Sequence, residues 1–283
     1  MYADLNSSST LCSLARWMVL CMVIIGCAIP KSFAVRRKSS SMPSQVVSKA
    51  HLSVEDGRPL AKAIELLESR YGWVITYDDP RYIHNSEIAD VTLRVRRDLD
   101  KYKPGEAPKV LVPKGGALTF DYDVRSDTNQ PSGRRAVVQE LLATYNRSGL
   151  AGRFRLEKNG PILHVIPMAI KNSHGQLMPQ ESILETRISL TAKERTGMEK
   201  LERICSATSQ ATKIRVGIGI VPENWLSRHR DSKGATRQRA RDVLVSLLES
   251  LGNSAKWSWQ LFYDPSPGLQ VYVLNIHPVI KHE

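Results

Sequence analysis

The spacing of hydrophobic residues in the second half of this chain repeats that of the first half. In the first half, an apolar helical stripe is followed by a glycine and then by two strand-like segments. The residues of this plan are Val137, Val138, Leu141, Leu142 and Gly149 in the first half, and Val243, Leu244, Leu247, Leu248 and Gly252 in the second. A repeated plan predicts duplicated small α+β modules, and such modules more often bind a partner than catalyse a reaction.

The first predicted module covers residues 51–171 and opens with a helix. Apolar residues at helical spacing begin after Pro59, which suits a first-turn position, and Gly72 can supply a left-handed C-terminal cap. A strand is predicted at residues 73–77, where β-branched and aromatic residues gather. A further strand is indicated by the alternation of Val91, Leu93 and Val95.

The middle of this module contains an insertion. Residues 96–116 carry charges, prolines and paired glycines, so we interpret them as an inserted loop with one short extended piece at residues 110–112. Apolar and polar residues then alternate over residues 118–124, which predicts a strand with one buried face. The second helix follows, and a hairpin is expected around Asn159-Gly160, a pair that favours a tight turn.

A boundary is expected between the two modules. Residues 172–182 are polar and contain a glycine and a proline, so we place a linker there. The second module, residues 183–283, is predicted to begin with a strand and a capping box formed by Thr191 and Glu194. The expected fold class is α+β, with two tandem small modules, each of two helices packed on a small mixed sheet and closed by a C-terminal hairpin.

Residues 1–34 have the pattern of an export signal. Arg16 supplies a positive charge, and residues 17–25 form an apolar run that is too short for a permanent transmembrane helix. Small residues at the positions that a signal peptidase reads predict cleavage after Ala34. An alternative stays open, because Cys27 follows a lipobox-like segment and would then become the first residue of a lipoprotein. Both routes predict a periplasmic or secreted protein.

The charge of the chain narrows its expected partners. Residues 35–50 are basic and rich in serine, which predicts a flexible tether, and the formal net charge of the whole chain is +12. This balance favours anionic partners, and for an exported protein we expect lipid head groups or acidic polymers rather than nucleic acid. A solvated basic surface without a specific ligand is the plainer interpretation.

Cysteine usage excludes a disulfide framework. Cys12, Cys21 and Cys27 lie in the leader, so only Cys205 remains after cleavage at Ala34. Apolar burial must therefore hold the fold, and no paired-cysteine metal or redox site is expected. Cys205 falls on an apolar helix face and is interpreted as an inert core thiol.

Residues 228–241 form the best candidate surface, because basic residues dominate this segment. Backbone N–H groups at a helix start attract anions, whereas arginines there oppose the helix dipole unless an anion is present. We therefore assign anion or partner binding to Arg228, Arg230, Lys233, Arg237, Arg239 and Arg241. A solvated loop is the alternative. Trp225 is placed to stack beside this segment, whereas the alternation of Trp257 and Trp259 favours a core face.

No other group of residues predicts catalysis. Asp78 and Asp79 end a predicted strand, and Asp121 and Asp123 fall on the solvent side of another, so we interpret both groups as structural. The seven histidines show no metal-ligand spacing, and no serine or glycine-rich loop fits a nucleophile or phosphate motif. We expect no enzyme activity, no cofactor and no metal ion.

The order of alternating strand, helix with paired leucines, glycine, aromatic strand, turn and aliphatic strand resembles the short N-terminal domain of secretins and TonB receptors. Residues 59–67, followed by residues 71–75, look like the first helix and strand of that domain, and residues 137–166 look like its second half. The resemblance covers about half of the mature chain, and the second module follows it more loosely. In that family the module lies in the periplasm and docks envelope proteins to one another.

Two departures limit what the resemblance implies. The insertion at residues 96–116 lengthens the first module, and no barrel or secretin segment follows Glu283 in this sequence. The implied relative is tandem and free-standing, so a role in secretion or siderophore signalling is not carried over. We expect a non-enzymatic envelope docking protein that binds another envelope protein. The alternative is a binder of anionic polymer or lipid head groups through residues 228–241.

Overall fold

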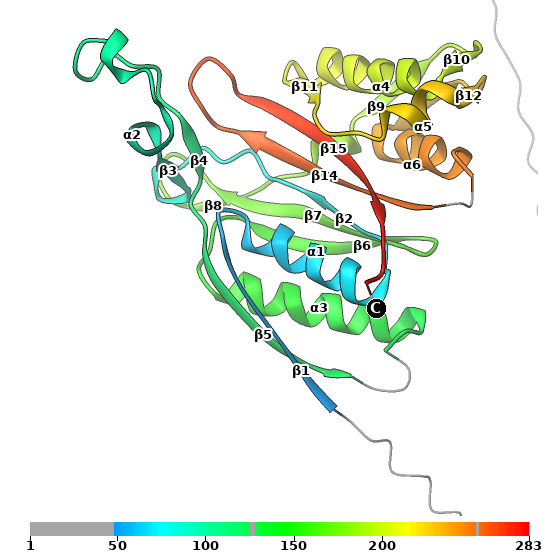
Figure 1. Ribbon diagram of the computed structural model, residues 1–283, viewed down its shortest axis with the longest axis horizontal. Coiled ribbons are helices and arrows are strands. Elements are labelled where there is room, and N and C mark those ends of the chain that lie inside the picture. The colour runs from blue at the N-terminus through cyan, green and yellow to red at the C-terminus, as the bar shows by residue number, and fades with distance from the viewer. Residues whose placement is uncertain (1–47, 125–127, 253–254, 283) are drawn as a thin grey trace, which may run out of the picture. The chain divides into compact units, whose positions relative to one another are not determined.

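Helices and strands alternate in a mixed α+β arrangement along the residues that the computed structural model describes, 48–124, 128–252 and 255–282 (Figure 1). All of these residues belong to one unit, Gln45–Glu283. The predicted leader, with Ala34 and Cys27, and nearly all of the predicted tether lie outside the described residues.

The first half of this unit follows much of the predicted order, but it opens with a strand, β1, that was not predicted. Its longer elements are β1 (Ser48–Asp56), α1 (Pro59–Tyr71), β2 (Ile75–Asp78), β5 (Gly116–Val124), α3 (Pro131–Arg147), β6 (Arg153–Asn159) and β7 (Ile162–Lys171). The predicted cap of α1 is confirmed, since Gly72 is left-handed with φ 67° and its N–H donates to the Glu68 carbonyl. The predicted hairpin is confirmed as well, because β6 and β7 pair antiparallel around Gly160 at φ 56°.

The second half adds a similar series. Its longer elements are β9 (Arg187–Leu190), α4 (Gly197–Thr212), β11 (Arg215–Ile218), β13 (Ala235–Arg239), α6 (Ala240–Ser250), β14 (Lys256–Asp264) and β15 (Val271–Val279). Shorter elements lie between α4 and β13, or just before α4: β10 (Arg195–Thr196), α5 (Glu223–Arg228) and β12 (Arg230–Asp231). The predicted closing hairpin is confirmed by the antiparallel pairing of β14 with β15.

The two halves share one seven-stranded mixed sheet. Its order is β11-β15-β14-β2-β7-β6, with a short strand, β8 (Leu177–Pro179), added along β7. The halves meet where β14 pairs parallel with β2, through Gln260 opposite Tyr77 and Leu261 opposite Asp78. Instead of two small sheets, the described residues therefore build one continuous main sheet.

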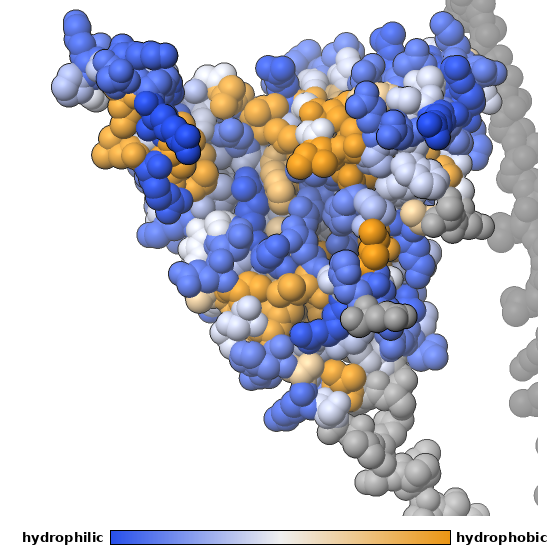
Figure 2. All heavy atoms as spheres, viewed as in Figure 1, coloured by the Kyte–Doolittle hydropathy of each residue, from blue (hydrophilic) through white to orange (hydrophobic). Residues whose placement is uncertain are grey.

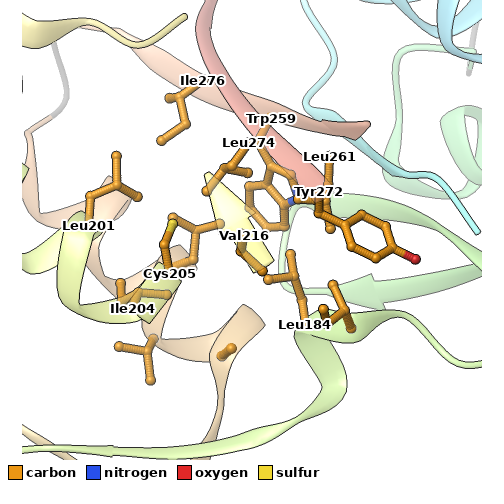
Figure 3. Packing of buried hydrophobic residues seen from close by; sticks show 14 of the residues in the cluster. Leu184, Leu201, Ile204, Cys205, Val216, Trp259, Leu261, Tyr272, Leu274 and Ile276 are labelled. Atoms are coloured by element: carbon orange, nitrogen blue, oxygen red, sulfur yellow. The ribbon is translucent and has the colours of Figure 1, made fainter. Parts of the chain in front are cut away.

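Helices cover both faces of this sheet (Figure 1). One apolar cluster joins α4 and α6 to the face that carries Trp259, Leu261 and Leu274 (Figure 3). The other cluster joins α1 and α3 to the opposite face, where Leu163 and Val165 of β7 are buried. Because successive residues of a strand point to opposite faces, β7 and β14 contribute to both clusters. Because Cys205, the single cysteine among the described residues, is unpaired, burial of these apolar side chains is the main source of stability.

A two-stranded ribbon packs on the outer side of α1 and α3. β1 pairs antiparallel with β5 along their whole length, from Ser48 opposite Val124 to Asp56 opposite Gly116. The alternation predicted for residues 118–124 is confirmed, because Leu118, Phe120 and Tyr122 are buried while the Asp121 side chain is 67% exposed.

The strand predicted from Val91, Leu93 and Val95 is wrong. The chain forms β3 (Ile88–Asp90) and then a four-residue helix, α2 (Thr92–Val95). The Asp90 carboxylate accepts hydrogen bonds from the Thr92 N–H at 2.9 Å and the Thr92 hydroxyl at 2.5 Å, which form a local turn just before the helix. A local side-chain hydrogen bond therefore overrides the alternation of apolar residues.

The predicted position of the capping box is also wrong. Helix α4 is capped by Thr196 and Glu199, whose side chains bond each other's backbone N–H, and not by Thr191 and Glu194. Both pairs fit the motif, but Arg195 and Thr196 form β10 opposite Asp231 and Arg230, so the extended chain continues up to the later pair.

The segment predicted as a linker, residues 172–182, returns to the main sheet. It turns at Gly175, pairs with β7 as β8, and ends at Ser182, whose hydroxyl accepts the Leu184 N–H at a short helical turn. This segment is therefore hydrogen-bonded to β7 of the main sheet, although the three side chains of β8 are exposed.

Candidate functional site

The six basic residues assigned to one surface lie in different environments. Arg228, Arg230, Lys233 and Arg237 are exposed, Arg239 is half-buried, and Arg241 is fully buried. The assignment of Arg241 to an accessible anion-binding surface is therefore wrong. Arg239 is also engaged inside the protein, as the following contacts show.

Protein carboxylates neutralise the two arginines at the start of α6. Arg241 donates from Nη2 to Asp78 at 2.6 Å and from Nε to Glu185 at 2.8 Å. Arg239 lies between Glu157 at 2.8 Å, Glu185 at 3.1 Å and Asp242 at 2.9 Å. The anions that these arginines were expected to need are carboxylates of the protein itself, Asp242 within α6 and Asp78, Glu157 and Glu185 from other segments.

Asp78 and Asp79 form the centre of a buried polar cluster where β2 meets β14. Asp78 accepts hydrogen bonds from Ser182 at 2.6 Å and from the Trp259 indole at 3.0 Å, in addition to its ion pair with Arg241. We call Arg58, Asp78, Asp79, Glu185 and Arg241 the junction cluster. It holds segments from both halves of the chain.

The second aspartate of the junction cluster is equally well satisfied. Asp79 pairs with Arg58 at 2.7 Å and accepts the Tyr77 hydroxyl at 2.7 Å and the Tyr263 N–H at 2.9 Å. Burial and the neighbouring Asp79 charge raise the pKa of Tyr77 well above its ordinary value, so this phenol stays protonated. The interpretation of the aspartate pair as structural is consistent with these contacts.

His164 lies beside the junction cluster in the middle of the sheet. Its Nδ1 is 2.7 Å from the Thr76 hydroxyl, its ring is 5.3 Å from that of Trp259, and its Nε2 has no hydrogen-bond partner among the described residues. Burial, followed by the charge of Arg241, lowers the pKa of His164 to about 3. The imidazole is therefore neutral and closed to solvent.

The exposed basic residues of the segment are presented on an anchored loop. The buried Lys200 ammonium lies 2.6 Å from the Asp231 carboxylate, which also accepts the Lys233 N–H at 2.7 Å. Hydrogen bonds from Lys200 and from the Lys233 N–H lower the pKa of Asp231 against the opposing effect of its burial. Arg230 and Lys233 therefore project from a fixed backbone.

Two of the predicted tryptophan positions are core positions and one is accessible. Trp257 and Trp259 are buried, as the alternation predicted, whereas Trp225 on α5 is 47% exposed. The Trp225 ring meets that of Trp257 edge to face at 5.8 Å. Trp225 also lines a pocket of about 330 Å³ with Arg228. Cys205 is buried, and burial raises its pKa to about 12, so it is an inert thiol.

Sequence reasoning missed a short arm that carries an apolar pocket. Between β2 and β5 the chain forms a short arm, residues 88–113, in which β3 pairs antiparallel with β4 (Leu111–Pro113) (Figure 1). Along the chain, β3 is followed by helix α2 and a 3₁₀ turn (Leu99–Lys101) before β4 begins. The short extended piece predicted at residues 110–112 is confirmed as β4, but its partner strand had no signal in the periodicity.

The arm carries an apolar pocket of about 630 Å³, near the middle of the range for ligand sites. Hydrophobic side chains are visible on the arm below a hydrophilic tip (Figure 2). Leu93 in the pocket wall is 85% exposed, and its neighbour Val95 is 49% exposed. The lining consists of Asp90, Val91, Thr92, Leu93, Arg94, Leu99, Tyr102, Lys103, Pro104, Gly105, Ala107 and Lys109.

Internal hydrogen bonds hold the arm in shape. Arg96 pairs with Asp98 at 2.9 Å, donates to the Tyr102 hydroxyl at 3.0 Å and lies over the Tyr102 ring at 4.9 Å. At the base, the Leu111 N–H donates to the Ser266 hydroxyl of the β14–β15 turn at 2.9 Å. The pocket is therefore formed before any partner arrives.

Comparison of the chain with protein-family models, with curated protein sequences and with solved structures finds no significant match. Among the described residues, no group of three potential metal-ligating side chains gathers, and no helix is long and apolar enough to cross a membrane. The arm and the exposed basic residues are therefore the candidate functional surfaces of the described residues.

Proposed function

We propose that this chain is an exported, non-enzymatic cell-envelope protein that docks another envelope protein. The apolar run at residues 17–25 and the cleavage signal before Val35 support export. The resemblance to the short N-terminal domain of secretins and TonB receptors supports a docking role.

We also propose that the shared sheet is built from two tandem modules. The series β1-α1-β2-β5-α3-β6-β7 corresponds in order to β9-α4-β11-β13-α6-β14-β15. The pairings agree as well: β1 with β5 and β9 with β13 are antiparallel, β2 with β7 and β11 with β15 are parallel, and each C-terminal hairpin is antiparallel. This equivalence supports the duplication proposed from the hydrophobic spacing.

The observation that carries the docking proposal is the arm. It holds the most voluminous of the pockets described above, and Leu93 remains 85% exposed in the pocket wall. Exposed, contiguous apolar surface on an otherwise charged protein marks an interaction site. The buried carboxylates of the junction cluster, by contrast, are consumed by internal hydrogen bonds and are not accessible to a substrate.

Affinity capture from an envelope extract tests this proposal. The mature chain is compared with a variant in which residues 92–109 are replaced by a short Gly-Ser linker that joins β3 to β4. We expect one protein to be captured by the native chain at high salt and lost with the shortened arm, because apolar contacts resist salt. Equal capture by both forms would assign docking to another surface.

The second candidate function is binding of anionic polymer or lipid head groups through the exposed part of residues 228–241. The observation in its favour is that the half-exposed Trp225 lies beside Arg228 in one pocket. Replacement of Arg228, Arg230 and Lys233 by serine should then abolish binding, and binding by the native chain should fall steeply with salt. Arg239 and Arg241 are left intact in this variant because they hold the fold.

A further inference from the structure

We propose that the arm pocket receives a large apolar side chain from an acidic segment of the partner protein. This inference rests on the proposed docking function and adds the chemistry of the partner. Its two parts, an apolar anchor and flanking carboxylates, follow from the apolar and the charged residues that line the pocket.

The apolar part of the pocket lining favours an apolar anchor. Val91, Leu99, Tyr102, Pro104 and Ala107 contribute to its lining, and the pocket lies on an arm that is braced by Arg96. Preformed apolar pockets that receive a single large side chain carry much of the binding energy in protein interfaces. The exposed Leu93 extends this surface at the pocket wall.

The charged part of the lining favours carboxylates. Arg94, Lys103 and Lys109 contribute three positive charges to it, and the side chains of Arg94 and Lys103 form no ion pair or hydrogen bond with the described residues. The one lining carboxylate, Asp90, is already bonded to Thr92 and lies 3.9 Å from Lys109. The lining therefore retains unneutralised positive charge that complements an acidic segment.

A protein segment suits this site better than a membrane surface. Interfacial membrane binding uses a long amphipathic helix that lies flat on the bilayer, whereas α2 has four residues and the apolar surface is concave. Membrane binding is an outcome of the test below.

Selection of peptides on the mature, full exported chain tests the proposal. The probe is a random twelve-residue peptide library displayed on phage, and the enriched peptides are then labelled with fluorescein for anisotropy titrations. We expect enrichment of a large apolar residue flanked by Asp or Glu. The double variant Lys103→Glu with Lys109→Glu should weaken binding by at least about tenfold, and Leu93→Ser should weaken it by about fivefold or more.

The matched control is Arg97→Glu with Lys101→Glu. Both residues are exposed on the same arm but do not line the pocket, and the net charge changes equally. We expect this control to change the dissociation constant by less than about threefold. Equal weakening by both double variants, or enrichment of basic peptides, would overturn the proposal.

Two further outcomes separate this inference from the docking function itself. Suppose that phosphatidylglycerol vesicles bind the native chain and the control variant but not the Lys103→Glu, Lys109→Glu variant. The pocket then binds lipid and the proposal fails. If the partner captured from envelope extract is retained by that variant and is not displaced by the selected peptides, docking stands while the pocket chemistry fails. Loss of the captured partner with this variant, but not with the control, supports the pocket chemistry.

Discussion

Arg241 shows how strongly one residue can depend on distant parts of the chain. Its guanidinium is fully buried and bonds Asp78 and Glu185. Replacement by alanine would leave the Asp78 carboxylate buried without its cation, although Ser182 and Trp259 would still donate to it. We expect Arg241→Ala to lower the free energy of unfolding by about 3–5 kcal/mol, measured by urea denaturation.

The control for this prediction is Arg228→Ala. Arg228 belongs to the same basic segment but is exposed, so its replacement should change stability by no more than about 0.5 kcal/mol. Similar losses for both variants would contradict the contrast between buried and exposed arginines.

His164 provides a prediction about pH. Its pKa is lowered to about 3 in the folded protein, first by burial and then by Arg241, whereas the unfolded chain has an ordinary histidine pKa near 6.5. As the pH falls below about 6.5, the unfolded state binds a proton that the folded state does not accept until about pH 3, so stability falls across this window.

The contribution of His164 to the pH dependence of stability can be measured by comparing variants that keep all other titrating groups. Between pH 7 and pH 5, His164 should account for a loss of about 2 kcal/mol in the free energy of unfolding. His164→Gln should remove that part of the pH dependence, whereas His174→Gln at an exposed position should retain it. An identical pH dependence in all three proteins would refute the buried, neutral state of His164.

The sequence predicted which apolar residues are buried, but it did not predict which carboxylates pair with the arginines. The burial of Cys205, Trp257 and Trp259 follows from apolar spacing, which is a local signal. The partners of Arg241 are 163 and 56 residues away along the chain, and no spacing rule connects them. Residues 228–241 were therefore predicted to form one basic surface, although tertiary contacts bury Arg241 and engage Arg239.

At the level of single elements, the start of α4 gives a direct test. Thr196→Ala should remove the hydrogen bond from the Glu199 N–H to the threonine hydroxyl and lower stability by about 0.5–2 kcal/mol in thermal or urea denaturation. Thr191→Ala is the matched control, because Thr191 fits the same sequence motif but is exposed and does not cap the helix. A larger effect at Thr191 would place the functional cap at the earlier position.

Most of the longer elements were predictable, but strand β1 and the arm were not. Helices α1, α3, α4 and α6 and the closing hairpins follow from apolar periodicity and turn residues. The arm was not predicted because its strands are only three residues long. In addition, hydrogen bonds between Asp90 and Thr92 favour helix α2 where the alternation of apolar residues indicated a strand. Periodicity carries little information over such short segments.

At the level of the whole molecule, the sequence did not predict that the two halves share one main sheet. Each half repeats its own local plan, but the join depends on two residue pairs between β14 and β2 and on the junction cluster. Parallel pairing between strands that are distant in the sequence leaves no periodic signature. The consequence is that apolar clusters of both halves are attached to one sheet.

This shared sheet predicts that the two halves unfold together. Pulsed hydrogen exchange read by mass spectrometry follows α1 and α3 separately from α4 and α6 across a urea series, and we expect one common midpoint. Because Arg241 and Asp78 belong to different halves, Arg241→Ala should lower both midpoints by the same amount. Thr196→Ala lies within the second half, and it should also lower both midpoints equally. In a cooperative unit, a loss of stability in one helix lowers the stability of the whole unit. Two separate midpoints, or a shift confined to α4 and α6, would show that the halves are independently stable modules joined by a weak contact.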